Sequence, residues 1–169
     1  MNYDYNCLMI SIPIKNWSTW TNKLQVTDIY QPQDSQYGIE SEPHITICYG
    51  IHQHITGIDL ECYLPRLTEL DDITLKNLSL FTTNPAFDVL KYDVESQKLI
   101  ELNAQIKNLF PVTSSYPKYI PHLTVAYLNK NSITEKDLQK YAEVNVNIKP
   151  KSYIYSYQNS KLILNGSRH

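Results

Sequence analysis

A seven-residue pattern occurs twice in this chain. Residues 43–49 are Pro-His-Ile-Thr-Ile-Cys-Tyr and residues 121–127 are Pro-His-Leu-Thr-Val-Ala-Tyr, so both copies share the frame Pro-His-apolar-Thr-apolar-X-Tyr. An internal repeat of this kind indicates a duplicated architecture. We therefore expect two half-domains, each of which presents one histidine and one threonine from a strand.

Strand geometry predicts how the side chains of each copy divide between two faces. Side chains two residues apart on a strand share a face, so His44 lies beside Thr46, and His122 lies beside Thr124. The remaining apolar and aromatic residues are expected on the opposite face, where they would pack the half-domains: Ile45, Ile47, Tyr49, Leu123, Val125 and Tyr127. If the two strands face each other across a cleft, two imidazoles and two hydroxyls converge on one small volume.

Two imidazoles and two hydroxyls are sufficient for phosphodiester cleavage without a covalent nucleophile. Free imidazole has a pKa near 6.5, so at neutral pH one histidine can accept a proton while the other donates one. Each transfer typically contributes roughly 10²–10⁴-fold to the rate. Threonine hydroxyls can donate to the phosphate oxygens while charge develops on them. The pattern does not determine which histidine is the base.

The composition narrows the class of protein. With 169 residues, 42% of them hydrophobic and 19% charged, the chain can bury a substantial core. The net charge of -2 argues against a duplex nucleic acid as partner. The apolar run at residues 8–14 is only as long as a strand, so neither a signal peptide nor a membrane span is expected.

The cysteines indicate a reducing compartment. Cys7, Cys48 and Cys62 form no C-x-x-C pair and no disulfide framework. We interpret all three as core thiols and expect a cytoplasmic protein.

Hydrophobic periodicity predicts an α+β fold. Helices are expected over residues 16–26, 57–70 and 96–110, and the first of them has Trp17, Trp20 and Leu24 on one face. A fourth helix is expected to run through Tyr141, with Ser132 as its N-cap and Glu135 as the capping-box partner of Ser132. Strands are expected over residues 6–14, 73–82, 86–94 and 144–148, in the segment with Tyr153, Tyr155 and Tyr157, and over 162–164. Residues 30–42 are expected to form a polar loop.

A zinc site is a weaker interpretation of the histidines. His52 and His54 follow His44 closely, but zinc requires three or four convergent ligands, and no Cys pair or carboxylate–histidine cluster supplies them at a recognisable spacing. We expect His52 and His54 to lie in the loop after the first motif and predict no metal.

The segments Pro43-His44-Ile45-Thr46 and Pro121-His122-Leu123-Thr124 resemble the paired His-x-Thr motifs of the two-histidine (2H) phosphoesterase superfamily. The resemblance implies one bilobal domain over residues 1–169, with two antiparallel sheets related by a pseudo-two-fold axis, helices outside and the active-site cleft between the lobes. It also implies that His44, Thr46, His122 and Thr124 are catalytic, that no cofactor is needed, and that the substrate is a 2′,3′-cyclic, 2′,5′- or 3′,5′-linked nucleotide.

Within that superfamily, residues 36–52 look most like phage anti-CBASS enzymes, which degrade the cyclic oligonucleotide signals of bacterial immunity, such as cGAMP. This finer resemblance implies attack of a 2′-hydroxyl on a 3′,5′-phosphodiester of a cyclic di- or trinucleotide in the host cytoplasm. It implies no membrane and no protein partner.

Base-stacking surfaces and other functions remain open at this point. Candidate stacking residues are Tyr155 and Tyr157 on a late strand, Tyr116 before the second motif, and Phe81 near a turn; each also suits the core or the surface. One alternative function is an RNA-end or tRNA-end 2′,3′-cyclic phosphodiesterase of the same fold. Another is a non-catalytic module that sequesters a nucleotide.

Overall fold

The computed structural model describes residues 4–18, 22–33, 36–114, 116–141, 144–157 and 160–166. In these residues, eight strands form one antiparallel sheet in the order β6-β3-β4-β5-β2-β1-β7-β8. The strands are β1 (Tyr5–Ser11), β2 (His44–His52), β3 (Thr74–Phe81), β4 (Phe87–Glu95), β5 (His122–Asn129), β6 (Val146–Asn147), β7 (Ser152–Tyr157) and β8 (Ser160–Leu164). The helices are η1 (Val26–Asp28), α2 (Gly57–Glu61), η2 (Leu67–Glu69), α3 (Gln97–Leu109) and α4 (Glu135–Leu138).

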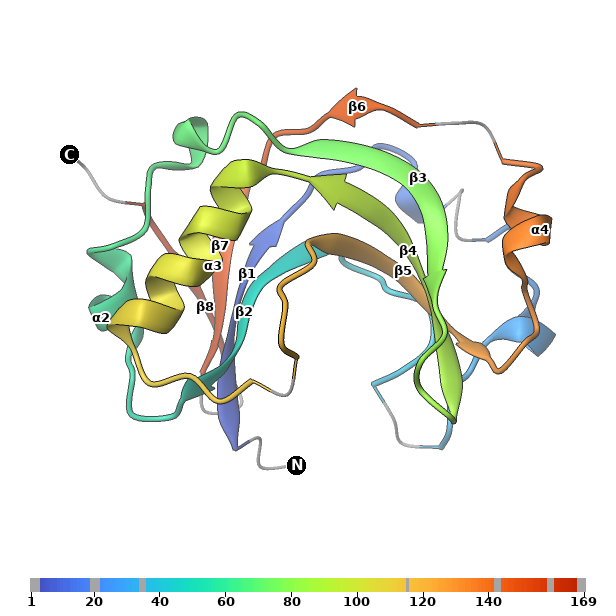
Figure 1. Cartoon of the computed structure of the whole chain (residues 1–169), viewed down its shortest axis with the longest axis horizontal. Coiled ribbons are helices and arrows are strands. Elements are labelled where there is room, and N and C mark those ends of the chain that lie inside the picture. The colour runs from blue at the N-terminus through green and yellow to red at the C-terminus, as the bar shows by residue number, and fades with distance from the viewer. Residues whose placement is uncertain are drawn as a thin grey trace.

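The structure contains both helices and antiparallel strands, which agrees with the predicted α+β class, but the prediction of two separate sheets is wrong. The two motif strands, β2 and β5, pair antiparallel at Ile45 and Leu123, which is the one residue pair recorded between them in the described chain. This pair joins β3-β4-β5 and β2-β1-β7 into one sheet. Figure 1 shows that the sheet bends into an arch, with α3 and α4 on its outer side.

The segment before the first motif covers β5. Beyond the Ile45–Leu123 pair the motif strands diverge, which opens one edge of each. Along β5, the N–H of Tyr30 donates to Tyr127 O (2.9 Å), and the N–H of Glu40 donates to Val125 O (2.9 Å). The described parts of the predicted polar loop, residues 30–33 and 36–42, thus reach the strand of the other motif through these two bonds.

The segment before the second motif covers β2 in the same way. The N–H of Thr113 donates to Gly50 O (2.9 Å), and the N–H of His52 donates to Pro111 O (3.1 Å). Gly50 has φ +94°, and a Cβ there would lie 1.9 Å from Thr113 O. Glycine is required at this close approach.

The outer face of the sheet carries the core, and α3 packs on it. The Ser96 side chain caps α3 by accepting the N–H of Leu99 (3.0 Å). Leu109 is the last residue of the helix and is 44% exposed. The core on this side contains Leu8, Ile10, Ile45, Leu99, Leu102 and Ile106.

An extra residue three positions after each motif histidine interrupts the alternation of its strand, and β2 has a second irregularity at Gly50. The register of β2 against β1 shifts at Ile47, and that of β5 against β4 shifts at Val125. Each such β-bulge reverses the faces of the side chains that follow it, up to the next irregularity. Tyr49 and Tyr127 therefore lie on the same face as the histidines, and the prediction that they face the opposite side is wrong. We call this face the inner face.

Both bulged carbonyl groups are satisfied by hydrogen bonds. The Asn103 side chain of α3, which is 6% exposed, donates from Nδ2 to Ile47 O at 2.8 Å. Val125 O accepts the N–H of Glu40 at 2.9 Å. Because a buried polar group without a partner is costly, these bonds stabilise the bulges.

Several predicted elements are shorter than expected. The helix expected over 57–70 ends at Glu61, and the chain turns before Pro65, which cannot donate within a helix. Residues 22–25 are not helical, although Trp17 and Leu24 are buried as predicted; Trp20 lies outside the described residues. The half-buried strand expected over 144–148 shrinks to β6, where Val146 is 52% exposed.

The capping box before α4 belongs to Thr134 and Asp137, and not to Ser132 and Glu135. The same Thr-x-x-Asp box begins α2, at Thr56. Thr56 follows His44 at the spacing at which Thr134 follows His122. The repeat therefore extends over residues 43–60 and 121–138, beyond the two motifs.

In the described part of the chain, the longest helices fall short of the length and hydrophobicity needed to cross a bilayer.

The first testable prediction concerns the bulge in β2. Asn103→Leu removes the donor to Ile47 O and leaves a buried carbonyl unpaired, so the free energy of unfolding should fall by about 1–3 kcal/mol. Asn108→Leu, on the exposed side of the same helix, should change it by less than about 0.5 kcal/mol. Denaturant unfolding measures both, and equal effects would contradict the role of Asn103.

Candidate active site

The four motif side chains meet beside the single pair that joins β2 to β5. In an antiparallel ladder the positions flanking a pair oppose each other. The pair Ile45–Leu123 therefore sets His44 opposite Thr124, and Thr46 opposite His122. Each histidine faces the threonine of the other motif on the inner face.

Matching hydrogen bonds orient the two imidazoles. His44 Nδ1 lies 2.9 Å from the carbonyl oxygen of Glu42, and His122 Nδ1 lies 2.8 Å from that of Ile120. A carbonyl oxygen only accepts, so each Nδ1 carries the proton. In the neutral ring, each Nε2 then has a free lone pair and is the atom available for proton transfer.

The local sequence produces this orientation. In both motifs a proline stands between the histidine and the residue whose carbonyl accepts the bond: Pro43 and Pro121. Proline fixes its own φ and keeps the preceding residue extended. The proline of each Pro-His pair therefore helps to hold the backbone in the conformation that orients the imidazole.

A buried lysine lies beside His122. Lys91 pairs with Thr124 across β4 and β5, and Asp93 pairs with His122. Lys91 is 4% exposed. Its Nζ donates to Asp93 Oδ1 (2.5 Å) and to Ser79 Oγ (2.5 Å). It also lies 4.2 Å from the centre of the Phe81 ring, whose own centre is 4.9 Å from that of His122.

The surroundings of His122 favour its neutral form. Burial is the largest cause that lowers the pKa of His122, and the charges of Lys91 and His44 lower it further. The Ile120 carbonyl and Asp93 act in the opposite direction without reversing the shift. Because the pKa of His122 is lowered, its imidazole is neutral at neutral pH.

His44 has a different electrostatic neighbour. The Glu40 carboxylate lies 3.9 Å from His44 Nδ1. Glu40 is itself held on β5 through its backbone N–H. The two histidines therefore have matching geometry and unlike charge environments.

Thr46 is positioned from two sides. Its carbonyl accepts the Tyr119 hydroxyl at 2.8 Å, and its own hydroxyl is hydrogen-bonded to the Cys7 sulfur. Sulfur is a weak acceptor, so a phosphate oxygen can compete for that hydroxyl. Burial raises the pKa of Cys7 to about 12, which keeps the thiol protonated.

The cysteines only partly match the prediction of core thiols. Cys48 is buried, Cys7 is half-buried on the inner face, and Cys62 is exposed. The prediction of a core thiol is therefore wrong for Cys62, which lies outside the core because α2 ends just before it.

The structure separates the predicted stacking residues. Phe81 lies on the inner face beside His122, and Tyr116 is 73% exposed in the segment that leads to the second motif. Tyr155 pairs with the core residue Leu8, so it and Tyr157 lie on the outer face. Tyr155 is 0% exposed and donates its hydroxyl to Ile55 O (2.7 Å). Burial therefore contradicts the stacking role predicted for Tyr155, while Tyr157 is partly exposed on the face opposite the histidines.

Sequence reasoning missed Lys91, Asp93 and Ser79. Lys91 and Asp93 alternate within a strand, a pattern that ordinarily indicates a solvated face. Only the pairing of β4 with β5 shows that this face adjoins the histidines.

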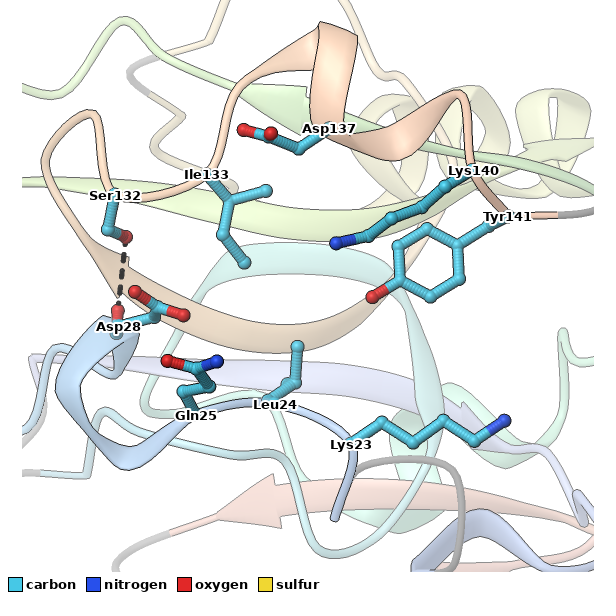
Figure 2. A pocket seen from close by; sticks show the side chains of 9 residues that line it. All are labelled: Lys23, Leu24, Gln25, Asp28, Ser132, Ile133, Asp137, Lys140 and Tyr141. Atoms are coloured by element: carbon cyan, nitrogen blue, oxygen red, sulfur yellow. Dashed lines mark hydrogen bonds between the residues drawn. The ribbon is translucent and has the colours of Figure 1, made fainter.

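Two surface hollows lie away from the histidines. Figure 2 shows one of about 280 Å³ between η1 and α4, where Ser132 Oγ donates to Asp28 O (3.3 Å). The other, of about 480 Å³, lies between α3 and the segment around η2. Neither is lined by a motif residue.

The described residues contain no group of three or more His, Cys, Asp or Glu side chains placed to hold a metal ion. His52 ends β2 and shares a hydrogen bond with Thr113 Oγ1 (2.8 Å), and its ring centre is 6.1 Å from that of His54.

No protein-family model matches this chain, and no curated protein matches it either.

The second prediction concerns the charge beside His122. In wild-type protein, the imidazole of His122 should titrate below 6.5. Lys91→Met removes one positive neighbour and should raise that midpoint, because a nearby cation disfavours the imidazolium. NMR titration of the ring protons measures it. Lys98→Met, on the outer helix, should leave the midpoint unchanged; a shift as large as that of Lys91→Met would refute the assignment.

Proposed function

We propose that this chain is a phosphodiesterase that uses His44 and His122 as a general acid–base pair and requires no metal ion. One observation carries the proposal: both rings donate Nδ1–H to a backbone carbonyl, which leaves both Nε2 atoms available on one face. A structural histidine needs no such paired orientation. Acid–base catalysis does, because one group must remove a proton while the other delivers one.

We also propose that the two halves are related by a pseudo-two-fold axis near the Ile45–Leu123 pair, and that the inner face between them is the active-site cleft. Supporting features are the symmetric strand order around β5 and β2, the bulges at equivalent positions, and the equivalent capping boxes.

The electrostatic differences support a division of roles. His122, whose pKa is lowered by burial and by Lys91, is the general base. His44, with the Glu40 carboxylate at 3.9 Å, is the general acid. The two rings thus have matching orientations and different charged neighbours.

The reaction follows from these roles. His122 Nε2 takes the proton of a substrate 2′-hydroxyl, whose oxygen attacks the adjacent phosphorus. The bond from phosphorus to the 5′-oxygen breaks, and His44 Nε2 gives its proton to that oxygen. The product ends in a 2′,3′-cyclic phosphate, while the hydroxyls of Thr46 and Thr124 donate to the non-bridging oxygens.

We propose a cyclic di- or trinucleotide with 3′,5′-linkages as the substrate, which would make the enzyme an antagonist of CBASS signalling. The support is the resemblance of residues 36–52 to phage enzymes of that activity. The net charge of -2 also fits a small ligand better than a long polyanion, whose affinity depends on lysine and arginine contacts.

The third prediction tests the acid–base pair. His44→Ala and His122→Ala should each lower turnover by at least about 10²-fold and leave substrate binding largely intact. His54→Ala, in the exposed turn after β2, is the matched control and should retain activity. The assay uses EDTA and a panel of cyclic dinucleotides, cyclic trinucleotides and 2′,3′-cyclic-ended RNA, with products read by mass.

Activity that survives both catalytic substitutions would reject the two-histidine assignment. If the enzyme instead prefers to open the 2′,3′-cyclic phosphate at RNA ends, its substrate is an RNA end and not a cyclic oligonucleotide.

The fourth prediction tests the division of roles. A substrate with sulfur in place of the bridging 5′-oxygen has a leaving group that needs no protonation. It should restore turnover to His44→Ala, which lacks the acid, and not to His122→Ala, which lacks the base. Restoration of the other variant instead would exchange the two roles. A 2′-deoxy substrate should not be cleaved by the wild-type enzyme.

A further inference from the structure

Aromatic side chains gather at two places on the inner face. The Tyr49 group consists of Tyr5, Tyr49 and His52. The Tyr127 group consists of Tyr30, Tyr37, Phe87 and Tyr127. Neither group includes a catalytic residue, and each contains the tyrosine that ends one copy of the motif.

The Tyr49 group stands on the first half of the sheet. The ring of Tyr5 lies edge-on to that of Tyr49, with centres 6.4 Å apart, and lies 5.7 Å from that of His52. Tyr49 is 52% exposed. A large aromatic ring is therefore available to a ligand in the middle of a strand.

The Tyr127 group stands on the second half. Tyr37 lies 5.0 Å from both Tyr127 and Phe87, ring centre to ring centre, and Tyr30 lies 5.2 Å from Phe87. All four rings are partly exposed. Mutual packing of the rings gives a rigid surface that loses little conformational entropy on binding.

The bulges place the two tyrosines on this face. Without the extra residues Ile47 and Val125, Tyr49 and Tyr127 would turn to the outer face, where the core lies. Both bulges are present, and the one at Ile47 has a buried side chain, Asn103, as the donor to its carbonyl. Tyrosines that served only the core would need neither bulge.

The two groups flank the histidines at equal spacing. Tyr49 and His44 pair with β1 residues four positions apart, and Tyr127 and His122 pair with β4 residues four positions apart. At roughly 3.3 Å per residue, each tyrosine lies about 13 Å along the strand from its histidine. Because β2 and β5 are antiparallel, the two tyrosines lie in opposite directions from the reacting centre.

We infer that the ligand of the inner face carries a nucleobase on each side of the reacting phosphodiester, and that the Tyr49 group binds one base while the Tyr127 group binds the other. The inference rests on the proposed function. It narrows the substrate class to cyclic or linear oligonucleotides cleaved at an internal linkage. A terminal 2′,3′-cyclic phosphate has a base on one side only and engages one group.

The test measures binding without turnover, in a His122→Ala background. The probes are cyclic di-AMP, cyclic di-GMP, a cyclic trinucleotide and adenosine 2′,3′-cyclic monophosphate, titrated by calorimetry. Tyr49→Ala and Tyr127→Ala should each weaken the tightest cyclic oligonucleotide by about 5- to 150-fold, the value of one stacked base. The mononucleotide should be weakened by only one of the two substitutions.

Matched variants separate stacking from folding. Tyr49→Phe and Tyr127→Phe keep the ring and should bind like the parent protein, and thermal unfolding of every variant is measured beside binding. Tyr63→Ala, an exposed tyrosine that packs on Phe110 beside α3, should not affect binding.

Three results would overturn the inference: no cyclic oligonucleotide binds, either alanine variant binds it normally, or both variants weaken the mononucleotide equally. If the predicted binding losses occur while wild-type protein cleaves no probe, the proposed catalytic function fails and the two base sites stand.

Discussion

The structure depends on a single backbone pair, Ile45 with Leu123. It joins the two motif strands where their histidines begin, and beyond it the strands diverge. The divergence prevents the halves from forming a flat sheet and opens an edge on each strand. The chain closes these edges with the two segments that lead into the motifs, each of which lies on the strand of the other half.

The bulges at Ile47 and Val125 are as important to the inner face as the pair that joins the two motif strands. In a strand with perfect alternation, the histidine and the threonine of each motif would lie on the inner face, and the tyrosine that ends the motif would lie on the outer face. The extra residues Ile47 and Val125 bring a tyrosine back to that face. Because each bulge leaves a carbonyl outside the ladder, it needs its own donor. Asn103 supplies one and the Glu40 backbone the other.

The two motif strands have similar backbones but different side chains beside their histidines and threonines. Lys91 and Met9 occupy equivalent positions, each paired with the motif threonine of its half, while Asp93 and Ser11 pair with the histidines. The Lys91–Asp93 ion pair beside one imidazole and the Glu40 carboxylate beside the other produce unlike charge environments without moving either ring. In the proposed mechanism this difference distinguishes base from acid.

The sequence by itself determined the local features. The repeated frame located both histidines and both threonines. The strands around residues 74–81 and 87–95 and the helix at 97–109 followed from periodicity, because their side-chain pattern is set by nearest neighbours. The Pro-His pairs also fixed the direction of the rings, since proline restricts the backbone on both sides.

Only the tertiary structure decided the relations between distant segments. The union of two expected sheets into one, the placement of Lys91 beside His122, and the burial of Tyr155 on the outer face depend on which strands pair and in what register. The bulges escaped prediction for the same reason. An inserted residue is visible only against the strand beside it, and its energetic support comes from Asn103 and Glu40, which lie far away in the sequence.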